Sequence, residues 1–358
     1  MKAVTIRANG GPEVVRVEDV PAPRPAAGEV VIAVRAAGLN HLDLWVRKGR
    51  PGARIAFPHV LGSDAAGVVA EVGEGVEGLE VGQDVILNPG LSCGHCEFCR
   101  RGEQSECETF TILGLGRPGT FAERVAVPAV NVYPKPPHLD WAEAAALGLS
   151  HVTAWRMLMA RARLVAGETV LIHGIGGGVA QAGLAIAHLA GAAKIVTSSS
   201  DEKLSRAKRL GADHGINYSS QPDATLRSSA SLRSTSVARA VRDLTGGRGV
   251  DVVMDTVGAA TWPVDFAAVR RGGRIVLCGV TTGAQAETPL QALYWNQVTV
   301  LGSTMGSQED FREMLRAVTA AHLKPVIDSR LPLERGPEAM ARMESGEQFG
   351  KIVLIVGD

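Results

Sequence analysis

The stretch Val170-Leu-Ile-His-Gly-Ile-Gly-Gly-Gly-Val-Ala180 decides the fold of the region around it. An apolar run that ends in clustered glycines predicts a buried strand over 169–173, a tight turn, and a helix over 178–191. Glycines at such a turn let the backbone approach a pyrophosphate, and the helix N-terminus stabilises its charge. The stretch departs from G-x-G-x-x-G, because Ile175 takes the first glycine position and Ala180 the third. A tight turn without a cofactor is the competing interpretation.

The chain after residue 168 alternates strands with helices, which predicts βαβ units and a parallel sheet. Before residue 137 it consists instead of short Val-rich strands separated by glycines and prolines, which predicts a compact β domain. The final strand, near 352–356, is expected to rejoin that β domain. We therefore expect one domain over 1–150 plus 305–358 and a second domain over 151–304.

One segment, 219–236, fits neither pattern. Nine of its eighteen residues are Ser or Thr. This composition predicts a flexible surface loop, because it offers little apolar surface to bury. A phosphorylated regulatory loop is conceivable, but no sequence feature supports it.

The bulk composition excludes several classes of protein. Lys+Arg and Asp+Glu each number 37 in 358 residues, which gives no support for nucleic-acid or membrane-surface binding. The N-terminus lacks the apolar run of a signal peptide, and no stretch is long and apolar enough to span a bilayer. We expect a cytoplasmic protein that acts on a small-molecule substrate and binds neither nucleic acid nor membrane.

Four of the five cysteines lie in Cys93-Gly-His-Cys-Glu-Phe-Cys-Arg-Arg-Gly-Glu-Gln-Ser-Glu-Cys107. Two-residue gaps allow a tight turn to bring thiolates to about 2.3 Å from one zinc ion, so the pattern predicts a closed structural zinc site within 90–110. An iron–sulfur cluster is disfavoured, because the last gap is seven residues and Glu108 follows it. The fifth, Cys278, ends an apolar run and is expected in the core. The predicted metal ligands are Cys93, Cys96, Cys99 and Cys107.

The second strand of the parallel sheet indicates the type of dinucleotide. It ends in Ile195-Val-Thr-Ser-Ser-Ser200, without the carboxylate that accepts the ribose hydroxyls in NAD sites. The first acid, Asp201, comes too late and is expected to cap the next helix. Hydroxyls near a cation suit a 2′-phosphate, so NADP(H) is favoured over NAD(H). The residues expected at this phosphate are Ser198, Ser199, Lys203 and Tyr218.

Together these pieces resemble the medium-chain dehydrogenase/reductase superfamily, which includes zinc-type alcohol dehydrogenases and quinone oxidoreductases. The similarity rests on the cysteine lobe, Gly62-Ser-Asp-Ala-Ala-Gly67, the glycine-rich turn, Asp255-Thr-Val-Gly258 and Gly350-Lys-Ile-Val353. It implies an α/β protein with a GroES-like β domain and a Rossmann-fold, doubly wound parallel sheet. It also implies a homodimer joined edge to edge through 297–303, with a homotetramer as the alternative.

The resemblance also shows what is missing from this chain. Alcohol dehydrogenases of the family hold a catalytic zinc through three side chains, and the matching positions here are Asn40, Ser63 and Leu149. Leu42 replaces the hydroxyl residue that passes the substrate proton outward. Without a Lewis acid, hydride removal from an alcohol loses its largest electrostatic contribution, whereas an enone or quinone carries its own electron sink. A relocated metal site would have to come from His41, Asp43, His59, Asp64 and His151.

We therefore expect an NADPH-dependent reductase of a quinone or activated C=C bond, with a structural zinc and no catalytic zinc. The alternatives are an alcohol dehydrogenase with non-standard metal ligands and a cofactor-binding protein without turnover. Asn40 is expected to donate to the substrate oxygen, Asp43 to orient its neighbours or cap a helix, and Ser63 to lie in the catalytic site. The remaining residues expected at the cofactor are His41, Thr153, Gly176, Gly177, Gly178, Val179, Gly258, Gly279, Thr281 and Lys351.

Overall fold

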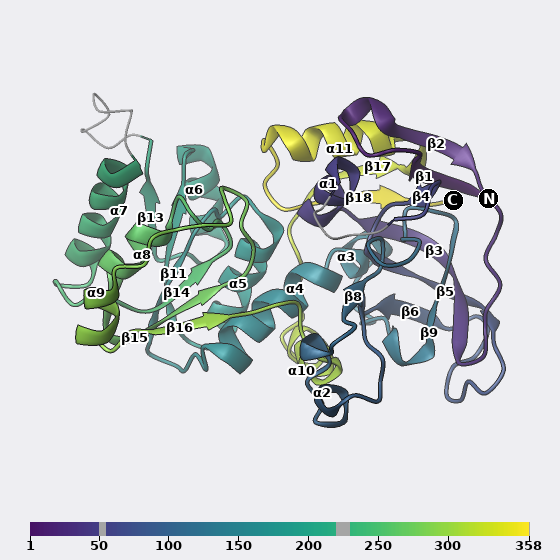
Figure 1. The fold of residues 1–358 in the computed structure, drawn as a ribbon, viewed down its shortest axis with the longest axis horizontal. Helices are drawn as coiled ribbons and strands as arrows, with labels where there is room; N and C mark the ends of the chain where they lie inside the picture. The colour runs from purple at the N-terminus through teal and green to yellow at the C-terminus, as the bar shows by residue number, and fades with distance from the viewer. Residues whose placement is uncertain (50–54, 220–229, 358) are drawn as a thin grey trace. The chain divides into compact units, whose positions relative to one another are not determined.

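The computed structural model describes residues 1–49, 55–219 and 230–357. It divides into two compact units (Figure 1). The first unit comprises Met1–Val152 and Met305–Asp358, and the second comprises Thr153–Thr304. Helix α4 (Gly148–Trp155) continues from one unit into the other, and a π-helical turn over Arg156–Arg161 follows it.

The first unit is built on an antiparallel sheet, which β17 joins in parallel. Its strand order is β10-β6-β5-β3-β18-β17. Strand β9 pairs with the N-terminal part of β3, whereas β18 pairs with the C-terminal part. The C-terminal strand β18 pairs with β3, Val353 opposite Gly38, so the end of the chain belongs to this unit. The strands of this sheet are β3 (Glu29–Gly38), β5 (Asp64–Val72), β6 (Asp84–Leu87), β9 (Arg124–Pro128), β10 (Val132–Pro134), β17 (Ile327–Pro332) and β18 (Lys351–Ile355).

Smaller elements complete the first unit. A three-stranded sheet and a two-stranded ribbon flank the main sheet. The strands are β1 (Lys2–Ile6), β2 (Val15–Asp19), β4 (His59–Val60), β7 (Gly90–Leu91) and β8 (Thr111–Ile112). The helices are α1 (His41–Lys48), α2 (Glu97–Arg100), α3 (Trp141–Ala145), α10 (Gln308–Ala320) and α11 (Gly336–Ser345).

The second unit is a six-stranded parallel sheet in the order β13-β12-β11-β14-β15-β16. Its central strand β14 is buried at every residue, as a sheet covered on both faces requires. Helices lie on both sides of it (Figure 1). The strands are β11 (Thr169–Ile172), β12 (Ala193–Ser198), β13 (His214–Asn217), β14 (Val250–Asp255), β15 (Val269–Leu277) and β16 (Thr299–Gly302). The helices are α5 (Gly178–Leu189), α6 (Asp201–Arg209), α7 (Ala230–Leu244), α8 (Trp262–Ala268) and α9 (Leu290–Trp295).

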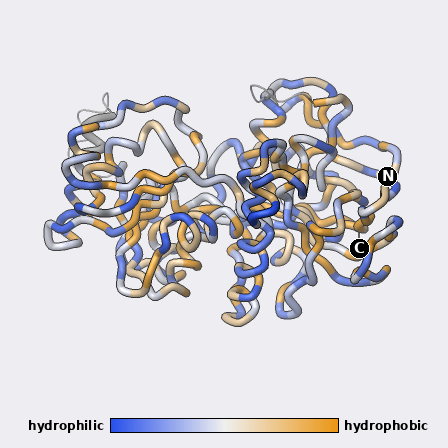
Figure 2. Tube along the Cα trace, turned by 60° about the horizontal axis from the view of Figure 1, so that its bottom comes forward, coloured by the Kyte–Doolittle hydropathy of each residue, from blue (hydrophilic) through white to orange (hydrophobic). Residues whose placement is uncertain are grey.

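The fold class predicted from the sequence is confirmed: an α/β chain with a β unit and a doubly wound parallel sheet. Apolar residues follow the inner strands of each unit, with polar residues outside (Figure 2). No helix in the described part of the chain combines the length and hydrophobicity needed to cross a membrane.

The loop predicted over 219–236 requires a correction. Ten of its residues, 220–229, lie outside the described residues, whereas 230–236 forms the start of helix α7. Val237 and Val241, further along the same helix, are buried in the core of the second unit. The Ser/Thr count misplaced the boundary, because a helix that is anchored by later apolar residues tolerates polar residues in its first turns.

Candidate functional site

The four clustered cysteines converge on one point. Their sulfur atoms all lie within 4.8 Å of one another, and Cys93 Sγ is 3.9 Å from Cys99 Sγ. Tetrahedral coordination with Zn–S bonds of about 2.3 Å separates the sulfurs by ~3.8 Å, so this spacing fits zinc. Backbone N–H groups of Cys93 and Cys96 donate to Cys107 Sγ and Cys93 Sγ, both at 3.3 Å, which stabilises thiolates.

His95 takes no part in this cluster: its Nδ1 contacts the Cys93 carbonyl at 2.8 Å, and its side chain is exposed. Among the described residues the cysteines form the only group of three or more His, Cys, Asp or Glu side chains close enough to share a metal. The relocated metal site considered from the sequence is therefore not formed. His59 instead contacts the Gly114 carbonyl at 2.9 Å through Nε2, and His151 contacts Ser150 Oγ at 3.2 Å through Nδ1.

The glycine-rich turn joins β11 to α5 in the second unit. Gly174 has φ of 66°, a conformation that favours glycine, and Gly177 N–H donates to its carbonyl at 3.0 Å. Gly177 is the N-cap of α5, so the first N–H groups of the helix are available to an anion. Gly176, Gly178 and Val179 lie in this same segment.

A glycine that the sequence argument missed lies one turn further into α5. A Cβ on Gly183 would come within 2.4 Å of Met254 Sδ in β14, so this glycine allows the helix to pack closely on the sheet. In the G-x-G-x-x-G pattern, the third glycine position falls at Ala180. The signal was present, because Gly183 is the next glycine in the helix, but its role depends on which strand the helix crosses.

The end of β12 presents hydroxyls as predicted, although they are not equivalent. Ser198 is buried and its Oγ accepts from Ser200 N–H at 3.1 Å, whereas Ser199 is exposed. Ser200 caps α6 by accepting from Lys203 N–H at 3.3 Å. Asp201 is the first residue of that helix and accepts from Asn217 Nδ2 at 2.7 Å. No carboxylate therefore stands at the strand end itself.

Loops after β14 and β15 reach the same edge of the parallel sheet, because carboxyl ends of parallel strands share an edge. Gly258 and Gly279 have φ of 92° and 91°, and Thr281 Oγ1 donates to the Val257 carbonyl at 3.3 Å. Tyr218 follows β13, and its N–H donates to the Ser198 carbonyl at 3.0 Å. The cofactor residues predicted in the second unit thus gather at one edge, apart from Thr153, which is buried on α4.

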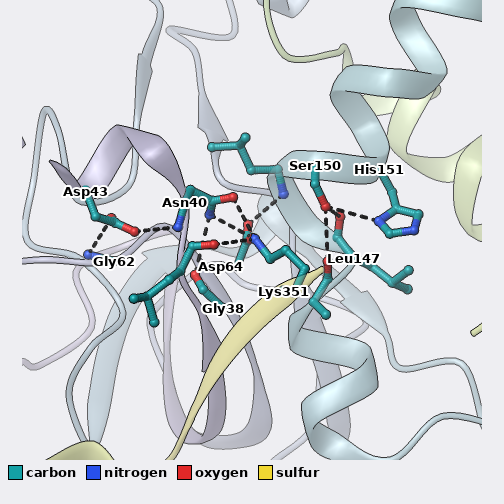
Figure 3. A network of polar contacts seen from close by, with 12 residues as sticks. Gly38, Asn40, Asp43, Gly62, Asp64, Leu147, Ser150, His151 and Lys351 are labelled. Atoms are coloured by element: carbon teal, nitrogen blue, oxygen red, sulfur yellow. Dashed lines mark hydrogen bonds and ion pairs between the residues drawn. The ribbon is translucent and has the colours of Figure 1, made fainter. Parts of the chain in front are cut away.

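The first unit contains a buried polar network around Asp64 (Figure 3). Asp64 Oδ2 accepts from Asn40 Nδ2 at 2.9 Å and from Lys351 Nζ at 3.0 Å. Asp64 Oδ1 accepts from the backbone N–H of Leu149 at 2.6 Å, at the start of α4. A Cβ on Gly148 would lie 2.2 Å from this oxygen, so glycine there lets the carboxylate reach the helix. The carboxylate also complements the positive end of the helix dipole.

Two of the predicted roles change because of this network. Lys351 was expected at the cofactor, but it is buried and its Nζ also contacts Leu39 O and Asn40 Oδ1, both at 2.7 Å. Its three N–H donors are thus used inside the first unit. Asn40 was expected to donate to a substrate oxygen, but its amide donates to Asp64 and, at 3.4 Å, to Gly38 O.

Asp43 performs the capping role that the sequence offered as one of its two options. Its carboxylate accepts from Asn40 N–H at 2.7 Å and from Gly62 N–H at 3.2 Å, joining α1 to the loop before β5. Burial raises the pKa of Asp43 to about 7. His41, the first residue of α1, is exposed. Through its two hydrogen bonds, Asp43 fixes the backbone of Asn40 and of Gly62, which precede α1 and β5.

Ser63 is the exception in this otherwise satisfied region. It is fully buried, and its Oγ has no hydrogen-bond partner in the described structure. An unpartnered buried hydroxyl costs on the order of 1–3 kcal/mol. A polar group held at such a cost is a candidate for binding a ligand or water.

Two family models match the chain. The alcohol dehydrogenase GroES-like domain covers 26–137, and the zinc-binding dehydrogenase domain covers 178–320. The chain belongs to the medium-chain dehydrogenase/reductase superfamily. As a member of that superfamily it is an NAD(P)H-dependent oxidoreductase.

Individual relatives carry different activities in their names. An NAD-dependent alcohol dehydrogenase of Sulfurisphaera tokodaii is 32% identical, covering 99% of this chain and 100% of its own length. A quinone oxidoreductase of Rattus norvegicus is 28% identical, covering 99% and 98%.

Solved structures similar to this chain also carry different activities in their names. A crystal structure of an NAD-dependent alcohol dehydrogenase is 44% identical with a TM-score of 0.91, covering all of both chains. A crotonyl-CoA carboxylase/reductase in complex with NADP is 27% identical with a TM-score of 0.90, covering 99% and 95%. The named relatives thus include alcohol dehydrogenases, a quinone oxidoreductase and a carboxylase/reductase.

Removing the Asp64 carboxylate tests the network. In Asp64→Ala the Lys351 ammonium stays buried without its counter-ion, which we expect to lower the free energy of unfolding by about 3–5 kcal/mol. Guanidinium-induced unfolding of the purified protein measures this change. Glu71→Ala breaks the half-exposed pair with Arg124 in the same unit and should cost less than about 1 kcal/mol. Equal costs for the two variants would contradict the assignment.

Proposed function

We propose that this oxidoreductase uses NADPH to reduce a quinone or an activated C=C bond, with one structural zinc and no catalytic metal. The observation that carries the proposal is the network of Asn40, Asp64 and Lys351. At the positions where alcohol dehydrogenases of the superfamily ligate zinc, this chain offers an amide, a hydroxyl and an alkyl side chain. The nearby carboxylate, Asp64, is already neutralised by an ammonium 3.0 Å away, and that ammonium would repel a dication.

The chemistry favoured by such a site needs hydrogen-bond donors in place of a Lewis acid. Bound NADPH would supply hydride to the alkene carbon or quinone, and negative charge would develop on the substrate oxygen. Since the amide of Asn40 is engaged, the hydroxyl of Ser63 is the better candidate to donate to that oxygen. Asn40 and Lys351 would hold the loop that presents Ser63, and Asp43 would hold it from the other side through Gly62.

The proposal predicts turnover together with a defined zinc content. The purified enzyme should oxidise NADPH with simple quinones or short enones, and it should contain one zinc per chain by elemental analysis. Alcohol oxidation with two zinc ions per chain would instead support the alcohol dehydrogenase named among its relatives. Failure to turn over any quinone, enone or alcohol would favour a cofactor-binding protein.

Ser63→Ala separates a catalytic from a structural role of this residue. Loss of one donor to a developing oxyanion should lower kcat/KM by about 10- to 100-fold. Because the hydroxyl has no protein partner, stability should stay unchanged or rise. Ser345→Ala, at an exposed helix end, is the matched control and should leave both quantities unchanged. A stability loss that accompanies normal kcat/KM would contradict the role.

The preference for NADPH over NADH is part of the proposal and rests on the end of β12. Ser199 is exposed there, Lys203 lies in the first turn of α6, and Asp201 is held by Asn217. These features suit a 2′-phosphate better than free ribose hydroxyls.

Lys203→Ala tests this preference directly. Removal of a charge-assisted contact to the phosphate should raise the KM for NADPH about tenfold and leave that for NADH unchanged. Lys208→Ala, an exposed lysine in the last turn of the same helix, should change neither value. A parallel rise for both cofactors, or a wild-type enzyme that prefers NADH, would exclude the phosphate role.

We further propose that the enzyme is a homodimer, with a homotetramer as the alternative. Strand β16 ends the parallel sheet and pairs with β15 alone in the part of the chain that the structure describes. Val300 in this strand and Leu290, Tyr294 and Trp295 in α9 are all exposed. Such an apolar sheet edge suits pairing with a second copy. A monomer in sedimentation analysis would contradict this assembly.

A further inference from the structure

A buried histidine and aspartate lie directly beneath the glycine-rich turn, and no step above uses them. His173 follows the last residue of β11 and precedes Gly174. Its Nε2 lies 2.9 Å from Asp265 Oδ1 of α8, and both side chains are almost completely buried. A buried titratable pair at this position is costly unless its charges are compensated.

The imidazole also contacts Thr197, the residue that hydrogen-bonds to the backbone of the glycine-rich turn. His173 Nδ1 lies 3.3 Å from Thr197 Oγ1 in β12, and the same hydroxyl accepts from Gly174 N–H at 3.3 Å. Ile175 N–H donates to the Thr197 carbonyl at 3.0 Å. The pair therefore connects α8 to the backbone of the turn that would hold the pyrophosphate.

A second carboxylate faces the pair from β14. Asp255 is fully buried and accepts from the N–H groups of Val257 and Gly258 and from Thr261 Oγ1. The Asp265 carboxyl also interacts with the Asp255 carboxyl, and this contact favours the protonated form of Asp265. Cys278 follows β15; burial, together with the charge of Asp255, raises the pKa of this thiol to about 12, so that it stays neutral.

His173 and Asp265 both have raised pKa values, so the pair retains a proton near neutral pH. Burial and the charge of Asp255 raise the pKa of Asp265 to about 8, and the carboxylates Asp265 and Asp255 raise the pKa of His173 despite its burial. One proton is shared between imidazole and carboxyl, since placing it on either partner gives the same total charge. Its loss leaves two carboxylates and a neutral imidazole beneath the turn.

We propose that His173 and Asp265 form a proton-holding pair that sets the charge beneath the dinucleotide pyrophosphate, so that cofactor binding is coupled to proton uptake. With the proton present, the imidazole and the two carboxyls together carry one net negative charge. Without it, a second negative charge faces the anionic pyrophosphate across the turn. Cofactor affinity therefore falls as pH rises through the pKa of the pair. The free energy of unfolding should also fall as pH rises, because the stabilising contribution of a histidine with a raised pKa is lost when the histidine is deprotonated.

The test compares cofactor affinity between pH 7 and 9.5 in the wild-type enzyme and in Asp265→Asn. The wild-type Kd for NADPH should rise about tenfold over this range, the effect of one added charge at ~10 Å and an effective dielectric constant of ~20. In Asp265→Asn the second negative charge cannot form, so the Kd should stay near its pH 7 value. A purely structural role would instead weaken binding equally at every pH.

Asp251→Asn is the matched control. Asp251 lies at the opposite end of β14, where it pairs with Arg248 and Arg270. Its replacement should lower stability and leave the wild-type pH dependence of the Kd intact. Retention of that dependence in Asp265→Asn would overturn the proposal.

Calorimetry of the wild-type enzyme decides the question if Asp265→Asn does not fold. Titrations with NADPH at pH 8.5 in two buffers of different ionisation enthalpy measure the protons taken up on binding. Binding should take up a fraction of a proton, because the cofactor favours the protonated pair. At this pH the phosphates of the cofactor are already fully ionised, so they contribute none. No proton uptake, with a Kd that does not change between pH 7 and 9.5, would overturn the proposal.

Discussion

The ion pair between Asp64 and Lys351 is the interaction on which the first unit depends. It joins β5 to the C-terminal strand β18, and Asp64 also holds the cap of α1 through Asn40 and the start of α4 through Leu149. Segments almost 300 residues apart in the sequence therefore meet at one carboxylate. Because both charges are buried, each is stable only in the presence of the other and of the surrounding hydrogen bonds.

This interaction also underlies the proposal that the chain reduces its substrate without a catalytic metal. The four cysteines would complete the coordination of one zinc ion and so leave no position on it for a substrate. Asn40 and the backbone of Leu149 both bind the Asp64 carboxylate, which the buried Lys351 ammonium neutralises.

In the second unit the decisive buried charges are those of His173 and Asp265, which lie beneath the glycine-rich turn. The parallel order β12-β11-β14 brings Thr197, His173 and Asp255 to one edge, where the glycine-rich turn begins. Asp265 reaches this edge from α8, which follows β14. The anion site thus consists of a helix N-terminus above and a titratable group below, and the second of these is visible only in three dimensions.

The sequence by itself determined what depends on short spacings: the cysteine lobe, the glycine-rich turn, the absence of an acid at the end of β12, and the α/β class. Each of these is a local pattern, in which residue type and separation along the chain limit the geometry. The tertiary structure alone decided the partners of long side chains and of buried groups. Lys351 was expected at a phosphate but pairs with Asp64, and the amide of Asn40 faces inward. Residues 230–236 belong to a helix, and Gly183 allows the helix packing assigned to Ala180. These outcomes depend on burial against segments distant in sequence, which no spacing within one segment encodes.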